Sequence, residues 1–270
     1  MSDSDKVFGG SISKVYATHL VPMIFEPYAA DLAKRLAGKN ISRLLEIAAG
    51  TGVVTRALAQ SLPPSVSIVA TDLSPAMLAE ASELGTSRPV EWREADAMKL
   101  PFPDQSFDAV VCQFGAMFFP DKSVAYSEAR RVLKPGGIFL FNVWDSTSEN
   151  EFAEIVVQTL QVLFPIDPPN FLRRTPYGHH DRKTLENDLA KAGFTNPVRI
   201  ESVPARGLAP SALSVAIGYC QGTPTRAEIE ARDPARMGEA TEAVAAAIAK
   251  RFGQGKVDGK IQAVVISVTR

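Results

Sequence analysis

A short apolar segment that runs into two closely spaced glycines constrains the fold of this chain more than any other feature. Residues 42–47 are mostly apolar, as in a strand that is covered on both faces of a sheet. Gly50 and Gly52 follow and allow a tight turn in which the backbone can approach a ligand. An apolar pattern with helical spacing continues over residues 53–62. The pattern therefore predicts a strand, a glycine turn and a helix.

Acidic residues near this turn indicate a nucleoside-bearing ligand. Glu46 lies four positions before Gly50, and Asp72 ends the next apolar segment. An acid at the second position can accept both hydroxyls of a ribose. A dinucleotide fingerprint would carry a third glycine three residues after Gly52, but that position is Thr55. The NAD pattern therefore fails, which disfavours a nicotinamide oxidoreductase.

Several motifs together resemble one enzyme family. Residues 46–52 (EIAAGTG) resemble the first motif of class I S-adenosylmethionine-dependent methyltransferases, with Ala48 where many members carry glycine. Residues 100–108 (LPFPDQSFD) and 131–137 (RVLKPGG) are similar to later stretches of the same family, in the same order. The resemblance covers residues 40–145. It is strongest to the branch that includes ubiquinone and menaquinone biosynthesis methyltransferases.

The resemblance implies a Rossmann-like α/β fold. We expect a seven-stranded, mostly parallel sheet with helices on both faces, an antiparallel last strand, and a helical cap over the carboxyl edge. The strands are expected at residues 42–47, 66–72, 90–96, 109–114, 138–144, 197–202 and 261–268.

We expect a single domain over residues 1–270. It would have a cofactor-binding core at 40–145, an N-terminal lid and helix at 1–39, and a cap insert at 146–180. Residues 1–19 are expected to be mobile. The insert is long and interrupted by prolines, and inserts of this length are usually functional or disordered.

The resemblance also implies S-adenosyl-L-methionine as the cofactor and S-adenosyl-L-homocysteine as its product. Asp72 would bind the ribose, and Leu73 and Met77 would flank the adenine. Asp96 would accept a hydrogen bond from the adenine amino group, and the amide of Ala97 would meet a ring nitrogen.

Two further places complete the expected cofactor site. Gln113 and Phe114 end a predicted parallel strand and should face the crevice where open α/β sheets bind ligands. In the resembled family an N-terminal segment folds over the ligands, which makes Tyr16 and Phe8 candidates for a lid. The whole expected set is Glu46, Ala48, Ala49, Gly50, Gly52, Asp72, Leu73, Met77, Asp96, Ala97, Gln113, Phe114 and Tyr16.

The expected reaction is in-line transfer of a methyl group to a small-molecule acceptor. An oxygen or carbon acceptor usually needs a base, whereas a neutral nitrogen does not. His179 and His180 are the candidate bases because they lie in the insert and histidine titrates near neutral pH. Backbone hydrogen bonding of both histidines is the competing interpretation. Aromatic residues near strand ends or in the insert would suit an apolar or aromatic acceptor, although core packing also explains them: Phe118, Phe119, Trp144, Phe164, Phe171 and Tyr177.

The composition of the chain narrows the classes of ligand and the cellular location that we expect for the protein. A net charge of −1 with no long basic run does not suggest nucleic acid, and no Cys/His spacing suggests a metal. Two cysteines, the polar acidic residues 1–5 and the absence of a long apolar run predict a cytoplasmic protein without a membrane span. A homodimer is left open.

A second function remains open at this stage. A non-catalytic protein could use the same fold to bind S-adenosylmethionine as a sensor or interaction module. The sequence leaves the acceptor and the methylated atom undetermined.

Overall fold

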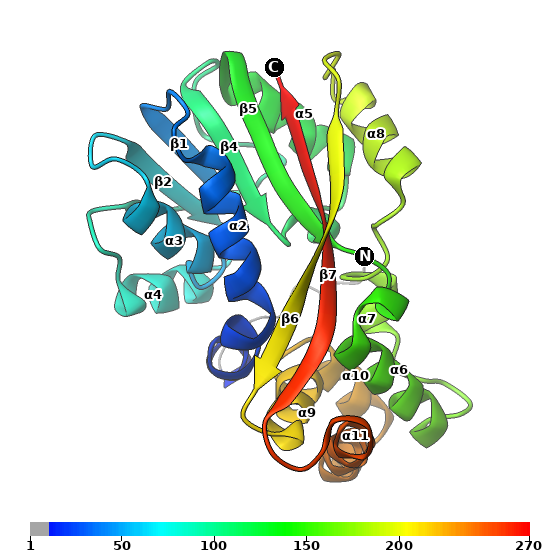
Figure 1. The fold of residues 1–270 in the computed structure, drawn as a ribbon. Helices are drawn as coiled ribbons and strands as arrows, with labels where there is room; N and C mark the ends of the chain where they lie inside the picture. Colours follow the sequence, from blue (N-terminus) through cyan, green and yellow to red (C-terminus); the bar gives the residue numbers. More distant parts are fainter. Residues whose placement is uncertain (1–10) are drawn as a thin grey trace. The chain divides into compact units, whose positions relative to one another are not determined.

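The computed structural model describes residues 11–270, and their contacts separate two compact units (Figure 1). Unit 1 comprises the described residues up to Pro27, Asp145–Gly178 and Pro204–Gln262, and unit 2 comprises the other described residues. The division into core, lid and cap made from the sequence stays a prediction. The predicted lid residue Phe8 lies outside the described residues.

One sheet of seven strands organises the chain, in the order β3-β2-β1-β4-β5-β7-β6. β1 pairs in parallel with β2 and β4, β2 with β3, and β4 with β5, while β7 runs antiparallel to β5. This confirms the predicted seven-stranded sheet with an antiparallel last strand. The strands are β1 (Arg43–Ile47), β2 (Ser67–Asp72), β3 (Glu91–Glu94), β4 (Phe107–Gln113), β5 (Leu133–Trp144), β6 (Arg199–Ala209) and β7 (Val257–Thr269).

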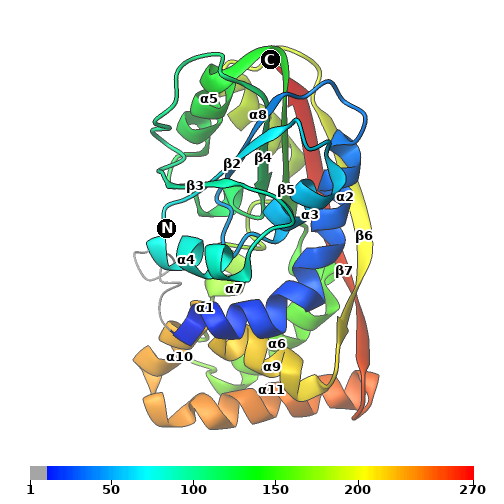
Figure 2. The same cartoon turned by 90° about the vertical axis from the view of Figure 1, so that its left-hand side faces the viewer.

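Helices cover both faces of the sheet in unit 2 (Figure 2). Leu32 of one helix and Leu58 of another share a buried cluster with Leu140 of β5. Tyr126 instead packs against Phe139 and Phe141, which flank Leu140 and so point to the other face. The helical segments of this unit are α2 (Glu26–Leu36, from Tyr28 onward), α3 (Val53–Ser61), α4 (Pro75–Leu84), η3 (Ala116–Phe118), α5 (Lys122–Val132) and α8 (Arg182–Lys191).

Unit 1 is mainly helical, and α11 packs against α9 and α6. Its segments are α1 (Ser11–Val15), η2 (Tyr16–Phe25), η4 (Thr147–Glu149), α6 (Glu151–Leu163), α7 (Phe171–Arg174), α9 (Ala212–Gln221), α10 (Thr225–Arg232), η5 (Pro234–Arg236) and α11 (Met237–Phe252). The expected mobility of residues 1–19 is wrong for 11–19, which are helical. His19 Nδ1 lies 2.9 Å from Ser214 Oγ, and the absence of a side chain at Gly218 makes room for Leu20.

β6 and β7 are longer than the sequence pattern predicted, and both continue into unit 1. Two glycines that resemble loop residues in the sequence lie in these strands. A Cβ atom at Gly259 would meet the ring of Phe152 at 2.8 Å, and one at Gly207 would meet the same ring at 3.2 Å. The two glycines therefore make room for a fully buried phenylalanine of α6.

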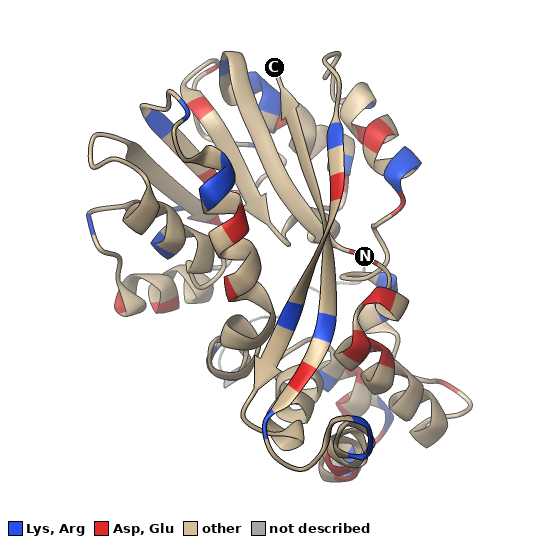
Figure 3. Cartoon of the chain, viewed as in Figure 1, with Lys and Arg blue, Asp and Glu red and all other residues tan. Residues whose placement is uncertain are grey.

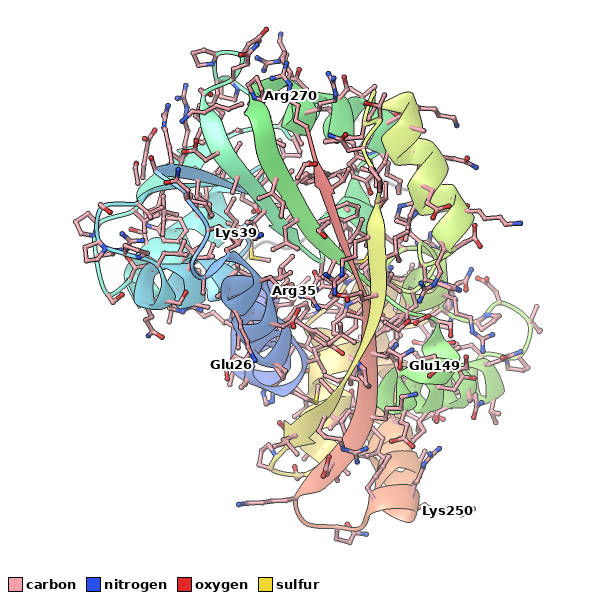
Figure 4. All side chains as sticks on the ribbon, turned by 45° about the horizontal axis from the view of Figure 1, so that its top comes forward. Glu26, Arg35, Lys39, Glu149, Lys250 and Arg270 are labelled. Atoms are coloured by element: carbon pink, nitrogen blue, oxygen red, sulfur yellow. The ribbon has the colours of Figure 1, made fainter. Side chains whose placement is uncertain are left out.

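Charged residues of both signs lie on the helices and also along β6 and β7 (Figure 3). On α2, Arg35 (labelled in Figure 4) pairs with Asp31 at 2.6 Å and with Glu201 of β6, which ties that helix to the edge strand within unit 2. At the end of β7, the guanidinium of Arg270 donates to the backbone oxygen of Arg131 at 3.1 Å. None of the helices within residues 11–270 is long and apolar enough to cross a membrane.

Candidate functional site

The turn between β1 and α3 has one tightly packed position and one open position. Gly50 and Gly52 both adopt positive φ, at +55° and +79°. A Cβ atom at Gly52 would lie 2.8 Å from Cη2 of Trp92, whereas one at Gly50 would meet no described atom within 4 Å. The backbone at Gly50 can therefore be approached closely, while Gly52 fixes the turn against the rest of the unit.

The carboxylate of Asp72 links this turn to the next helix. Its Oδ2 accepts from the Gly50 amide at 2.8 Å, and its Oδ1 accepts from the Ser74 amide at 2.8 Å. Burial raises the pKa of Asp72, and these backbone hydrogen bonds oppose that rise. Leu73, the next residue, leaves 56% of its surface exposed. Asp72 thus connects the ends of β1 and β2 at their carboxyl edge, beside an exposed apolar side chain.

Glu46 lies beneath the turn and is almost fully buried. The hydroxyl of Thr55 donates to its Oε2 at 2.6 Å, and the Thr71 hydroxyl donates to its backbone oxygen at 2.9 Å. Burial raises the pKa of Glu46 to about 8, partly offset by the Thr55 hydrogen bond and the charge of Arg56. Thr55 occupies the position of the third glycine of a dinucleotide motif, and here it supports a buried carboxyl group instead.

The segment after β3 lies next to Asp72. The Ala95 amide donates to the backbone oxygen of Asp72 at 3.0 Å. Asp96 follows; it is exposed, and its Oδ1 accepts from the Met98 amide at 2.8 Å. Ala97 is buried. A carboxylate with free lone pairs therefore stands at the same sheet edge as Asp72.

Met77 lies in the first turn of α4 and is buried. Its amide donates to the Ser74 hydroxyl at 3.4 Å, and Pro75 occupies the first helical position, as the sequence predicts for a capped helix start. The side chain therefore packs in unit 2, and its expected contact with adenine stays a prediction.

The turn after β4 contains an unusual backbone conformation. Phe114 adopts φ +50°, and its amide donates to Oδ1 of Asn142 at 2.9 Å. Asn142 is fully buried on β5, opposite Gln113. The side chain of Asn142 thus holds the first residue beyond β4, at the same sheet edge as the glycine turn.

An aromatic cluster adjoins this turn. The rings of Phe114 and Trp144 are stacked, with their centroids 3.8 Å apart. The ring of Tyr28 is nearly perpendicular to both, with centroid distances of 5.4 Å to Phe114 and 5.5 Å to Trp144. All three side chains are at most 5% exposed. Of the six aromatic residues suggested as acceptor contacts, only Phe118 is partly exposed, and the other five are buried. Core packing therefore accounts for most of them.

His179 and His180 precede α8 in unit 2. Burial lowers the pKa of His179 to about 4, and the charges of Lys122 and His180 act in the same direction. Nε2 of His179 lies 4.0 Å from Oδ2 of Asp188, beyond hydrogen-bonding distance. A pKa of about 4 means that His179 is neutral at pH 7. The side chain of His179 is buried, whereas that of His180 is only half-buried.

Comparison with known proteins identifies the family. A methyltransferase domain family matches residues 45–141. The ubiquinone/menaquinone biosynthesis C-methyltransferase UbiE of Pseudomonas fluorescens is 30% identical over 184 residues, which cover 63% of this chain and 71% of that protein. The chain belongs to the class I S-adenosylmethionine-dependent methyltransferases.

A further relative and a solved structure show how far the similarity extends. The UbiE protein of Pseudomonas aeruginosa is 32% identical over 166 residues, and the chain spans 65% of its length. A putative methyltransferase of Bacillus halodurans has a similar fold, with a TM-score of 0.57, 20% identity, and coverage of 89% of this chain and 97% of that one. The family and fold are therefore shared over most of the chain, at low sequence identity.

The methyltransferase fold brings together most of the expected cofactor positions within unit 2. Ala49 donates its amide to the Thr71 oxygen at 2.9 Å, beside the linked pair Gly50 and Asp72. Tyr16 belongs to unit 1, where its ring lies 5.1 Å from Phe25, and its role as a lid residue stays a prediction.

Sequence reasoning missed Asn142, which holds the turn after β4. Asn142 is the one polar residue in the apolar run 138–144, a signal that could have marked it. Asp108 lies in β4, and its Oδ2 accepts from the amides of Ser42 and Arg43 at 3.0 and 2.9 Å, which gives it a structural role away from the glycine turn.

Proposed function

We propose that this protein is an S-adenosylmethionine-dependent methyltransferase that acts on a small-molecule acceptor. The observation that carries the proposal is the Asp72 carboxylate, which joins the glycine turn after β1 to the start of α4 at the carboxyl edge of parallel strands. Ligands of open α/β sheets bind at this edge. Family membership is the second support.

The residues at this edge fit the cofactor. Asp72 accepts hydrogen bonds from the backbone amides of Gly50, Ser74 and Leu73, and a carboxylate offers about four acceptor sites, so a ribose hydroxyl can still be bound. Gly50 allows a close approach to the backbone. Thr51, in the same turn, buries a hydroxyl that has no hydrogen-bond partner within residues 11–270, as a group reserved for a ligand would.

Each expected residue then has a separate task. Asp72 binds the ribose, and Asp96 with the Ala97 amide reads the adenine. Leu73 and Met77 contact the adenine faces, while Gln113 and Phe114 border the reacting end. The bound cofactor supplies an activated methyl group. The protein mainly holds the acceptor in line with that group and keeps water away.

The acceptor is proposed to be a small apolar or aromatic molecule. The curated relatives are named as C-methyltransferases of ubiquinone and menaquinone biosynthesis, which favours a ring substrate. Phe118, the partly exposed aromatic residue after β4, is the side chain in unit 2 best placed to contact it. A homodimer stays a prediction, and sedimentation of the purified protein tests it.

A base would be needed if the acceptor is a hydroxyl or an acidic carbon. A group with a pKa of about 4 holds a proton poorly at neutral pH, which argues against His179. We therefore propose His180 as the base. Its replacement by alanine should lower turnover roughly 10²–10⁴-fold while cofactor affinity changes little. His19→Ala, a histidine of unit 1, is the matched control. Full turnover by His180→Ala would leave positioning as the mechanism.

Two measurements test the function as a whole. Calorimetry with S-adenosyl-L-homocysteine tests whether the cofactor product binds, and transfer of a labelled methyl group to pooled small molecules tests for catalysis. Binding together with transfer supports the enzyme. Binding without transfer to quinols, phenols, amines or thiols would favour the sensor alternative, and no binding at all would contradict both.

A further inference from the structure

Two neighbouring turns at the carboxyl edge both contain a non-glycine residue with positive φ. Ala48 follows β1 with φ +54°, and Phe114 follows β4 with φ +50°. β1 and β4 pair in parallel, so the two turns are adjacent. Residues other than glycine rarely adopt this conformation and keep it only where the surrounding structure holds them.

The two turns touch at Gly115. A Cβ atom at this position would lie 2.4 Å from Cβ of Ala48 and 2.9 Å from Sγ of Cys112. The backbone of Gly115 has φ −96°, which any residue can adopt. Glycine is therefore required here by its neighbours and not by its own conformation.

The contact bears directly on the turn proposed to bind the cofactor. The methyl group of Ala48 has no side-chain torsion through which it could move aside, so pressure on it must shift the backbone. The next amide, that of Ala49, donates to Thr71, and the amide of Gly50 donates to Asp72. A displaced Ala48 would disturb both hydrogen bonds.

The turn on the other side of the contact is firmly held. Asn142 accepts from the Phe114 amide, and the Cys112 thiol accepts from the amides of Gly115 and Ala116. The ring of Phe114 is stacked as well. A side chain added at Gly115 would therefore push Ala48 rather than its own turn.

We propose that Gly115 is a positioning residue for the cofactor turn: its missing side chain lets the turn after β4 support Ala48 and so sets the backbone that binds S-adenosylmethionine. The inference rests on the proposed function for its ligand. The Cβ atom of Ala48 lies where a Cβ atom at residue 115 would meet it at 2.4 Å, so Ala48 requires glycine there. The pair should behave as one coupled unit.

A double-mutant cycle tests the coupling. Affinity for S-adenosyl-L-homocysteine is measured by calorimetry for the unmodified protein, Gly115→Ala, Ala48→Gly and the double variant. Gly115→Ala should weaken binding roughly tenfold, as overpacking of a well-filled contact does. The double variant should bind more tightly than Gly115→Ala and approach the affinity of Ala48→Gly, because the 2.4 Å contact with Cβ of Ala48 is removed and only the 2.9 Å contact with Sγ of Cys112 remains. Gly238→Ala is the matched control, since a Cβ atom there meets nothing within 4 Å.

The outcomes separate the claims. Unchanged binding by Gly115→Ala, or a double variant as weak as Gly115→Ala, overturns the proposal. If Gly115→Ala does not fold, the double variant is compared with Ala48→Gly: equal affinity supports the proposal and a tenfold loss contradicts it. If the unmodified protein does not bind the ligand, the proposed function fails. The midpoints of thermal unfolding of the same four proteins then test the steric coupling between Gly115 and Ala48. The coupling is refuted if the shift in the double variant equals the sum of the shifts in the two single variants.

Discussion

The hydroxyl of Thr55 donates a 2.6 Å hydrogen bond to Oε2 of Glu46, and both residues are almost fully buried. Thr55 lies on the first turn of α3, and Glu46 lies on β1 directly beneath the glycine turn. The pair therefore joins the strand to the helix on either side of the turn. It also explains why this chain departs from a dinucleotide fingerprint, because a glycine here would leave a buried carboxyl group without its donor.

Replacement of Glu46 by glutamine should change how stability depends on pH. Burial raises the folded-state pKa of Glu46 from 4.5 to about 8. Its stabilising contribution is complete below pH 4.5 and is lost as the pH rises towards 8, because the unfolded chain ionises first. The glutamine of Glu46→Gln stays neutral at every pH. By pH 8 the free energy of unfolding of this variant should therefore have risen, relative to that of the unmodified protein, by on the order of 4 kcal/mol.

Urea unfolding of both proteins at pH 5 and pH 8 measures this difference. Asp104→Asn, which changes an exposed carboxylate, serves as the control. A constant difference between Glu46→Gln and the unmodified protein at the two pH values would show that Glu46 ionises normally in the folded state.

His179 should produce the opposite dependence on pH. Burial lowers its folded-state pKa from 6.5 to about 4, so the unfolded chain binds the proton more readily between these values. Stability should therefore fall by about 3 kcal/mol as the pH drops from 6.5 to 4, and His179→Gln should lack this loss. Chemical unfolding at pH 7 and pH 4.5 checks it, with His180→Gln as the control. Equal acid sensitivity of His179→Gln and the unmodified protein would refute the assignment.

Gly52→Ala should lower the free energy of unfolding by about 2–4 kcal/mol. An alanine at residue 52 would have to adopt the left-handed backbone conformation, and its Cβ atom would lie 2.8 Å from Trp92. Gly38→Ala is the matched control: φ is +75° there, but nothing lies within 4 Å, so about 1 kcal/mol is expected. Thermal unfolding compares the two. Equal losses would mean that the contact with Trp92 is not constraining.

Elements with strong local signals were predictable from the sequence. The apolar run into Gly50 and Gly52 predicted β1 and its turn, and the Ser74 and Pro75 pair predicted the start of α4. The positions of β1, β2, β4 and β5 follow from their apolar runs, because both faces of these strands are covered. The edge strand β3 is polar and follows instead from the alternating pattern of residues 90–96.

Features that depend on contacts between distant residues were not predictable. From the sequence, Gly207 and Gly259 resemble loop residues. The structure shows that they lie in strands and leave space for the ring of Phe152. The need for glycine at residue 115 depends mainly on Ala48, which lies against it and is 67 positions earlier in the chain. The low pKa of His179 likewise depends on the burial of its side chain in the folded chain, and the sequence alone does not show which side chains are buried.

The central claim is that Asp72 and the glycine turn bind the cofactor, and calorimetry with S-adenosyl-L-homocysteine tests it most directly. Asp72→Ala should weaken binding by about 1.5–3 kcal/mol, as expected for lost hydrogen bonds to a charged group. Asp108→Ala is the matched control, because Asp108 also accepts two backbone amides but lies at the start of β4, at the opposite edge. The account predicts weaker binding by Asp72→Ala and unchanged binding by Asp108→Ala. Equal affinity of Asp72→Ala and the unmodified protein, with both folded, would contradict it.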